Sequence, residues 1–112
     1  PVRLYYTGWS SSTGEADWGL RPLFAGDKTP PSMYNISYYK NPTVDADIMK
    51  ALGTTDRAEK TKLYTEVQEE IWKDAPWAFL VTEKLLYATS KKLTGMYVMP
   101  DANYFFEEID LQ

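Results

Sequence analysis

One stretch in the middle of the chain constrains the fold most, because it carries the marks of a single long helix. Apolar side chains recur there every four residues, which places them on one helix face and predicts that this face is buried: Leu63, Val67 and Ile71. Asp56 and Glu59 fit an N-terminal capping pair, and Pro76 forces a stop. We therefore expect a helix over 56–74 that packs against other parts of the chain.

The rest of the pattern predicts a mixed α/β fold. A second amphipathic helix is expected over 43–52, ending at Gly53, and a short helix over 17–24 with Asp17 as its cap. Strands are expected where β-branched, aliphatic and aromatic residues run together: 2–7, 77–82, 85–89, 93–99 and a short piece at 104–106. The order strand, helices, strands is typical of the α/β class.

The composition excludes several kinds of function. The 112 residues contain no His and no Cys, which removes the commonest general base, thiolate zinc sites and cysteine nucleophiles. The net charge of −4 argues against binding to a nucleic-acid backbone or to an anionic membrane surface. The longest apolar run, residues 77–81, is too short to span a bilayer. We therefore expect no cofactor, no metal, no nucleic-acid partner and no membrane insertion.

The stretch from Gly8 to Thr13 holds the most interesting chemistry. It lies just past the expected N-terminal strand, and ligands bind at the carboxyl ends of strands in open α/β sheets. Gly8 permits close approach of a ligand, and Trp9 offers a flat apolar wall with one donor. Three serines, Ser10, Ser11 and Ser12, add hydroxyl and backbone N–H groups. Composition alone fits a ligand-binding loop and a polar loop with a core Trp equally well.

Two other motifs have a functional and a plain interpretation. Glu15 and Asp17 stand two positions apart and could pair as acid and base or bind a cation, but a turn acid followed by a helix cap explains them more simply. Asn35-Ile36-Ser37 matches a glycosylation sequon by pattern alone.

The stretch from Tyr6 to Trp18 resembles periplasmic solute-binding proteins of peptide-type ABC importers, the dipeptide/oligopeptide-binding family, and within it the members that bind glutathione. The resemblance continues through four further segments: 56–61, 71–77, 92–95 and 99–101. The ending Ile109-Asp110-Leu111-Gln112 resembles a C-terminus of that family, and the beginning Pro1-Val2-Arg3, without an initiator Met, looks like that of a processed or excised piece.

The resemblance implies a fold and a division of the chain. The chain is expected to be the C-terminal part of a two-lobed, type 2 periplasmic binding protein. Residues 1–83 would belong to the ligand-binding lobe that carries the Gly-Trp loop and two helices. Residues 84–112 would cross back to complete the other lobe, with Glu83-Lys84 as a candidate hinge.

The resemblance also implies a function without catalysis. The protein would bind glutathione or a related small peptide between its lobes and deliver it to the permease and ATPase subunits of the importer. Trp9 is expected to pack on the ligand, Ser10, Ser11 and Ser12 to hydrogen-bond to it, and Gly8 and Tyr6 to line the site. Many relatives carry an Asp for the peptide ammonium where this chain has Ser12, which disfavours ordinary dipeptides and fits glutathione.

Three alternatives remain open from the sequence. The ligand could be a dipeptide, an oligopeptide or a nickel-type solute bound by the same family. The protein could be an extracellular hydrolase that uses Glu15 and Asp17. It could also be a carbohydrate- or peptide-binding module that works alone, since aromatic residues make up 15% of the chain.

Overall fold

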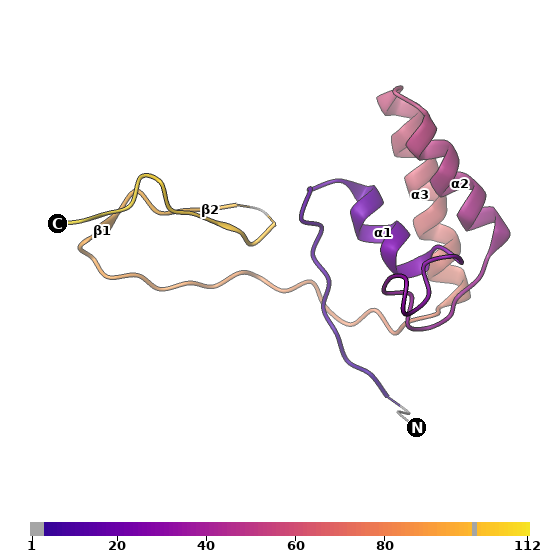
Figure 1. The fold of residues 1–112 in the computed structure, drawn as a ribbon, viewed down its shortest axis with the longest axis horizontal. Coiled ribbons are helices and arrows are strands. Elements are labelled where there is room, and N and C mark those ends of the chain that lie inside the picture. Colours follow the sequence, from indigo (N-terminus) through magenta and orange to yellow (C-terminus); the bar gives the residue numbers. More distant parts are fainter. Residues whose placement is uncertain (1–3, 100) are drawn as a thin grey trace. The chain divides into compact units, whose positions relative to one another are not determined.

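The computed structural model describes residues 4–99 and 101–112 (Figure 1). In chain order the elements are α1 (Ala16–Phe24), α2 (Pro42–Gly53), α3 (Arg57–Asp74), β1 (Leu93–Thr94), β2 (Tyr97–Val98), β3 (Tyr104–Phe105) and β4 (Asp110–Leu111). The chain divides into two compact units. One is the continuous stretch Glu15–Phe79, and the other combines the two ends of the chain, up to Gly14 and from Leu80 onward.

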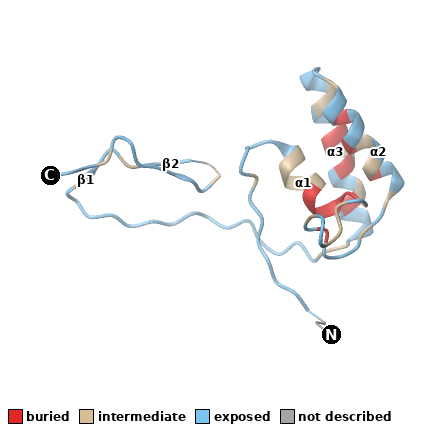
Figure 2. Cartoon of the chain, viewed as in Figure 1, coloured by how far each residue is buried: buried red, intermediate tan, exposed pale blue. Residues whose placement is uncertain are grey.

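The helical unit is built around the apolar face of α3. Its core contains buried side chains from all three helices and the residue after α1: Leu23, Phe24, Ala25, Val44, Ile48, Val67 and Ile71. A second cluster joins α2 to the N-terminal half of α3: Ala51, Leu63 and Tyr64. Figure 2 shows the buried residues where the helices face one another. The predicted four-residue repeat of α3 is therefore confirmed as its buried face.

The helix ends follow from capping groups next to them in sequence. Asn41 Oδ1 accepts hydrogen bonds from Thr43 N (2.9 Å) and Val44 N (3.4 Å), which starts α2 one residue earlier than predicted. Asp56 Oδ1 accepts from Ala58 N at 2.8 Å at the start of α3, as predicted. Ala75 closes α3 with a left-handed φ of 45°, ahead of Pro76.

Two predictions about helix starts are wrong in detail. Glu59 does not bond back to Asp56, because its carboxylate accepts from Thr54 Oγ1 at 3.0 Å. Asp17 does not cap α1, because Glu15 is the residue that precedes this helix and Asp17 lies within its first turn. There the Asp17 carboxylate reaches one turn forward to Arg21 instead of back to free N–H groups.

The loop between α1 and α2 is held by one buried side chain. Asn35 is fully buried, and its Nδ2 donates to Ala25 O (3.0 Å) and Tyr39 O (2.8 Å). Its Oδ1 accepts from Tyr39 N (3.1 Å) and Ser37 Oγ (3.0 Å). Asn35 therefore stabilises the loop, and its amide is inaccessible to a glycosylating enzyme in the folded chain, which overturns the sequon interpretation.

Several predicted strands are not formed. Within the described residues, 4–7, 77–82 and 85–89 have no ladder partner, and residues 2 and 3 of the first strand lie outside the described part. Every residue from Leu80 to Ser90 is exposed. A strand is stabilised by hydrogen bonds to a neighbouring strand, so apolar residues without such a neighbour stay extended and unpaired. In place of strand pairing, Trp77 packs on Phe24 with ring centroids 5.0 Å apart.

The second unit contains two small antiparallel ladders. β1 pairs with β4, with Leu93 opposite Leu111, and β2 pairs with β3, with Tyr97 opposite Phe105. Gly95 separates β1 from β2 with a φ of +74°, so the expected strand over 93–99 is confirmed as two short pieces with a bend. The described chain thus combines helices with short antiparallel strands. Both kinds of element that the α/β prediction requires are present.

Candidate ligand-binding site

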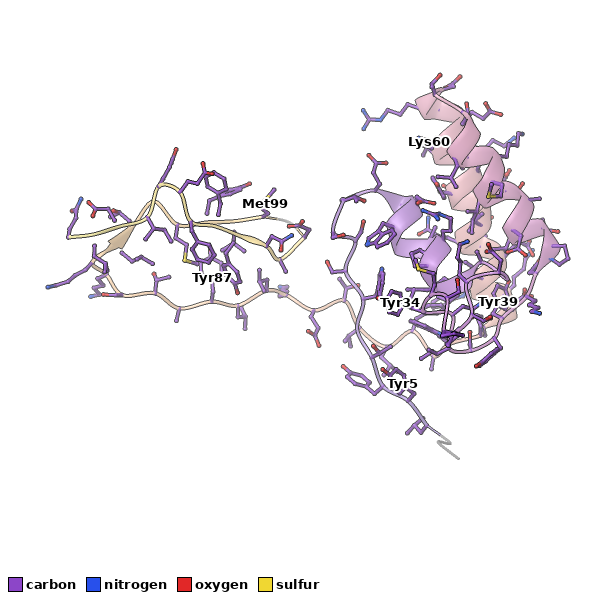
Figure 3. The ribbon with its side chains drawn as sticks, in the orientation of Figure 1. Tyr5, Tyr34, Tyr39, Lys60, Tyr87 and Met99 are labelled. Atoms are coloured by element: carbon purple, nitrogen blue, oxygen red, sulfur yellow. The ribbon has the colours of Figure 1, made fainter. Side chains whose placement is uncertain are left out.

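The segment that carries the candidate site residues runs without regular structure up to α1 (Figure 3). Tyr6 is 71% exposed and Trp9 is 36% exposed, so part of each residue is accessible to solvent. A Cβ added to Gly8 would have no other atom within 4 Å. The backbone at this point is therefore open to an approaching molecule.

The three serines occupy different positions in a turn. The N–H of Gly14 donates to Ser11 O at 3.1 Å and closes a turn that presents Ser12 at its exposed corner. The hydroxyl groups of Ser11 and Thr13 lie 3.4 Å apart. Ser10 Oγ donates instead to the backbone carbonyl of Asp101, 91 positions further along the chain, at 3.4 Å.

The chain forms a second turn around this contact. The N–H of Met99 donates to Asn103 O at 2.8 Å, and the N–H of Ala102 donates to Met99 O at 3.0 Å. The Asp101 carboxylate accepts from Asn103 N (3.2 Å, on Oδ1) and from Asn103 Nδ2 (2.8 Å, on Oδ2). Nothing in the sequence pattern indicated that the turn at Asp101 would lie against Ser10.

Asp17, the second acid of the alternative catalytic pair, is engaged by other side chains of the helical unit. Arg21 Nε donates to Asp17 Oδ1 at 2.8 Å, and Arg21 Nη2 donates to Oδ2 at 2.7 Å. The Tyr64 hydroxyl donates to Oδ1 at 3.4 Å. Hydrogen bonding to Asp17 raises the pKa of Arg21, and burial, followed by the Asp17 charge, raises the pKa of Tyr64 to about 12. Asp17 therefore serves as the structural partner of an arginine, which disfavours the acid–base interpretation.

Over residues 4–99 and 101–112, no three His, Cys, Asp or Glu side chains come together in a way that could hold a metal ion. Within the same ranges, no helix has the length and apolar character needed to cross a membrane.

No protein-family model matches the chain. Comparison with curated proteins finds similarity along almost its whole length to proteins that are named for binding a small ligand. The relatives carry the name glutathione-binding protein GsiB. The one from Pectobacterium atrosepticum is 62% identical over 110 residues, which is 98% of this chain and 21% of that protein. Those from Salmonella typhimurium and Escherichia coli are each 54% identical over 111 residues, 99% of this chain and 22% of theirs.

This similarity confirms the resemblance to glutathione-binding proteins that the sequence around Trp9 indicated. The chain spans about a fifth of the length of the curated relatives it matches.

Proposed function

We propose that these 112 residues are the C-terminal part of a two-lobed periplasmic solute-binding protein that serves an ABC importer. Its ligand is glutathione or a related small peptide, and its partners are the permease and ATPase subunits. The observation that carries the proposal is identity of 54–62% over 98–99% of the chain to proteins named for binding glutathione. Because the alignments cover 98–99% of the chain, they include the candidate site segment.

The candidate residues have the properties that such a site needs. Trp9 is a partly exposed residue with an aromatic ring for packing, and the turn at Ser11 and Ser12 carries hydroxyl groups without charge. Gly8 and Tyr6 lie beside them on the same segment. Glutathione carries two carboxylates, and none of these residues has a positive charge, so the groups that clamp the carboxylates lie elsewhere in the whole protein.

Isothermal titration of the full-length protein with reduced glutathione and a panel of dipeptides tests the proposal. We expect tight binding of glutathione, weak binding of dipeptides, and recovery of chemically unchanged ligand by mass spectrometry. A heat signal from dipeptides with silence toward glutathione would discard the ligand and keep the class. Cleavage of the ligand would favour a hydrolase instead.

A chimaera isolates the contribution of this chain. The matching segment of the Pectobacterium atrosepticum relative would be replaced by these residues, since the alignment spans 110 residues and 98% of this chain. The chimaera is expected to bind glutathione within about fivefold of the unmodified relative. A folded chimaera without binding would show that this chain departs from its relatives at the site.

A further inference from the structure

The contact between Ser10 and the turn at Asp101 places the backbone of an acidic residue beside the candidate ligand-binding segment. Residues 6–13 contain no Asp, Glu, Lys or Arg, so the segment by itself offers only neutral groups. Ser10 Oγ donates to the Asp101 carbonyl at 3.4 Å, and both residues belong to the same compact unit. Asp101 is therefore an acidic residue whose backbone is hydrogen-bonded to one of the three serines.

The Asp101 carboxylate is oriented but not neutralised. Asn103 donates to both of its oxygens, at 3.2 Å through its N–H and at 2.8 Å through Nδ2. These two bonds fix the carboxylate in the turn and occupy about half of its four or so acceptor positions. No ion pair to a Lys or Arg is formed by Asp101 in the described part of the chain. The side chain is half-buried, so a charged partner would be partly shielded from water.

A peptide ligand has a group that matches this arrangement. Glutathione carries an ammonium group on its γ-linked glutamate, and an ammonium removed from water needs a carboxylate partner to offset its desolvation. A hydroxyl group at Ser12 cannot supply that charge. We infer that Asp101 binds the ammonium group of the peptide ligand, with Ser10 holding the turn of Asp101 against the ligand-binding segment. This inference rests on the proposed function, since it concerns the same site.

The test is a double-mutant cycle between protein and ligand, measured by titration of the full-length protein. The ligands are reduced glutathione and glutaryl-cysteinylglycine, in which hydrogen replaces the α-amino group. Asp101→Asn is expected to weaken glutathione binding about ten- to a hundredfold, because a hydrogen bond between charged groups is lost. The same variant should leave the affinity for the deaminated ligand within about twofold, since that ligand has no ammonium to lose.

Two variants serve as controls. Glu107→Gln removes the same charge from an exposed position of the same unit, and it should change neither affinity. Asp101→Glu keeps the charge and should recover part of the lost affinity. Thermal unfolding of each variant checks that the fold is retained.

Each outcome decides a different point. If Asp101→Asn lowers the affinity for both ligands equally, the inference is overturned and Asp101 is a structural residue of the turn. No loss of either ligand would overturn it as well. Silence of the unsubstituted protein toward glutathione would overturn the proposed function itself, and the inference with it.

Discussion

The hydroxyl group of Tyr39 donates a hydrogen bond of 2.6 Å to Oδ2 of Asp74, which ties the loop before α2 to the last residue of α3. Asn41 Nδ2 donates to the same oxygen at 2.8 Å. The bonds from Tyr39 and then Asn41 lower the pKa of Asp74, so the folded chain favours its charged form. The loop is thereby fixed at both ends, by this contact and by Asn35.

The first prediction concerns stability at high pH. Burial, and then the bond to Asp74, raises the pKa of Tyr39 to about 12 from an ordinary value of 10.0, and burial gives Tyr64 a similar value. The two neutral phenols therefore make their full contribution to the free energy of unfolding below pH 10. This contribution is lost as the pH rises from 10 towards 12.

Urea unfolding between these pH values should show the free energy of unfolding falling, with a smaller fall in Tyr39→Phe. Ultraviolet absorbance should show two phenols, those of Tyr39 and Tyr64, ionising with a midpoint of about pH 12. Ionisation of Tyr39 and Tyr64 at the ordinary tyrosine pKa of 10.0 would contradict the burial of the two rings.

The second prediction concerns the buried amide. Asn35→Ala should lower the free energy of unfolding of the helical unit by about 3 kcal/mol, because Ala25 O and Tyr39 N lose their partners in a buried place. Ser37→Ala removes one exposed donor of the same cluster and should cost below about 1 kcal/mol. Equal effects of the two substitutions, measured by urea unfolding, would mean that Asn35 is solvated in solution.

The third prediction concerns the bend between β1 and β2. Gly95 has a φ of +74°, and a Cβ built there would lie 1.8 Å from Glu108 O, so Gly95→Ala should disrupt the pairing of β1 with β4. Hydrogen exchange of the Gln112 N–H, which donates to Lys92 O at 2.9 Å, reports this pairing. Gly8→Ala is the matched control, since no atom lies within 4 Å of its added Cβ. Unchanged protection of Gln112 in Gly95→Ala would refute the close approach.

The fourth prediction concerns the candidate packing wall. In the full-length protein, Trp9→Ala should weaken glutathione binding by about 2–4 kcal/mol, roughly thirty- to a thousandfold, if the ring packs fully on the ligand. Trp9→Phe should lose less, because it keeps an aromatic face. Trp72→Ala removes a 68% exposed Trp from the helical unit and should leave the affinity unchanged. An affinity unaffected by Trp9→Ala would remove Trp9 from the site.

The fifth prediction concerns selectivity. Ser12→Asp adds a negative charge at the exposed corner of the serine turn, which should weaken binding of glutathione and strengthen binding of a simple dipeptide through its ammonium. Titration with both ligands measures the change in the ratio of their affinities. Thr13→Asp, which adds the same charge at the next position, is the control. If both affinities stay flat, Ser12 does not face the ligand.

The helices were predictable from the sequence because their signals are local. Asp56 caps α3 through N–H groups two and three residues away, and the four-residue repeat from Leu63 to Ile71 sits within one helix. Errors appear where several groups compete for the same partner. Asp17 was expected to cap α1, yet Arg21 lies one helical turn away and offers two charged donors.

The strands and the site were less predictable because their partners are distant in sequence. The run from Trp77 to Thr82 has the composition of a buried strand, but composition does not supply a neighbouring strand to pair with. Resemblance identified the segment from Tyr6 to Ser12 as a candidate site. Nothing in the pattern could show that Ser10 would meet a carbonyl 91 positions away.

The continuous stretch Glu15–Phe79 has a core of its own, whereas the unit around it is made from both ends of the chain. The helical unit is therefore delimited by two chain boundaries, one between Gly14 and Glu15 and one between Phe79 and Leu80. Exchanging it requires cuts at these two places alone. Recombination between related genes can move these residues as one block. The candidate site segment and the turn at Asp101, which lie on opposite sides of that block in sequence, would stay together through such an exchange.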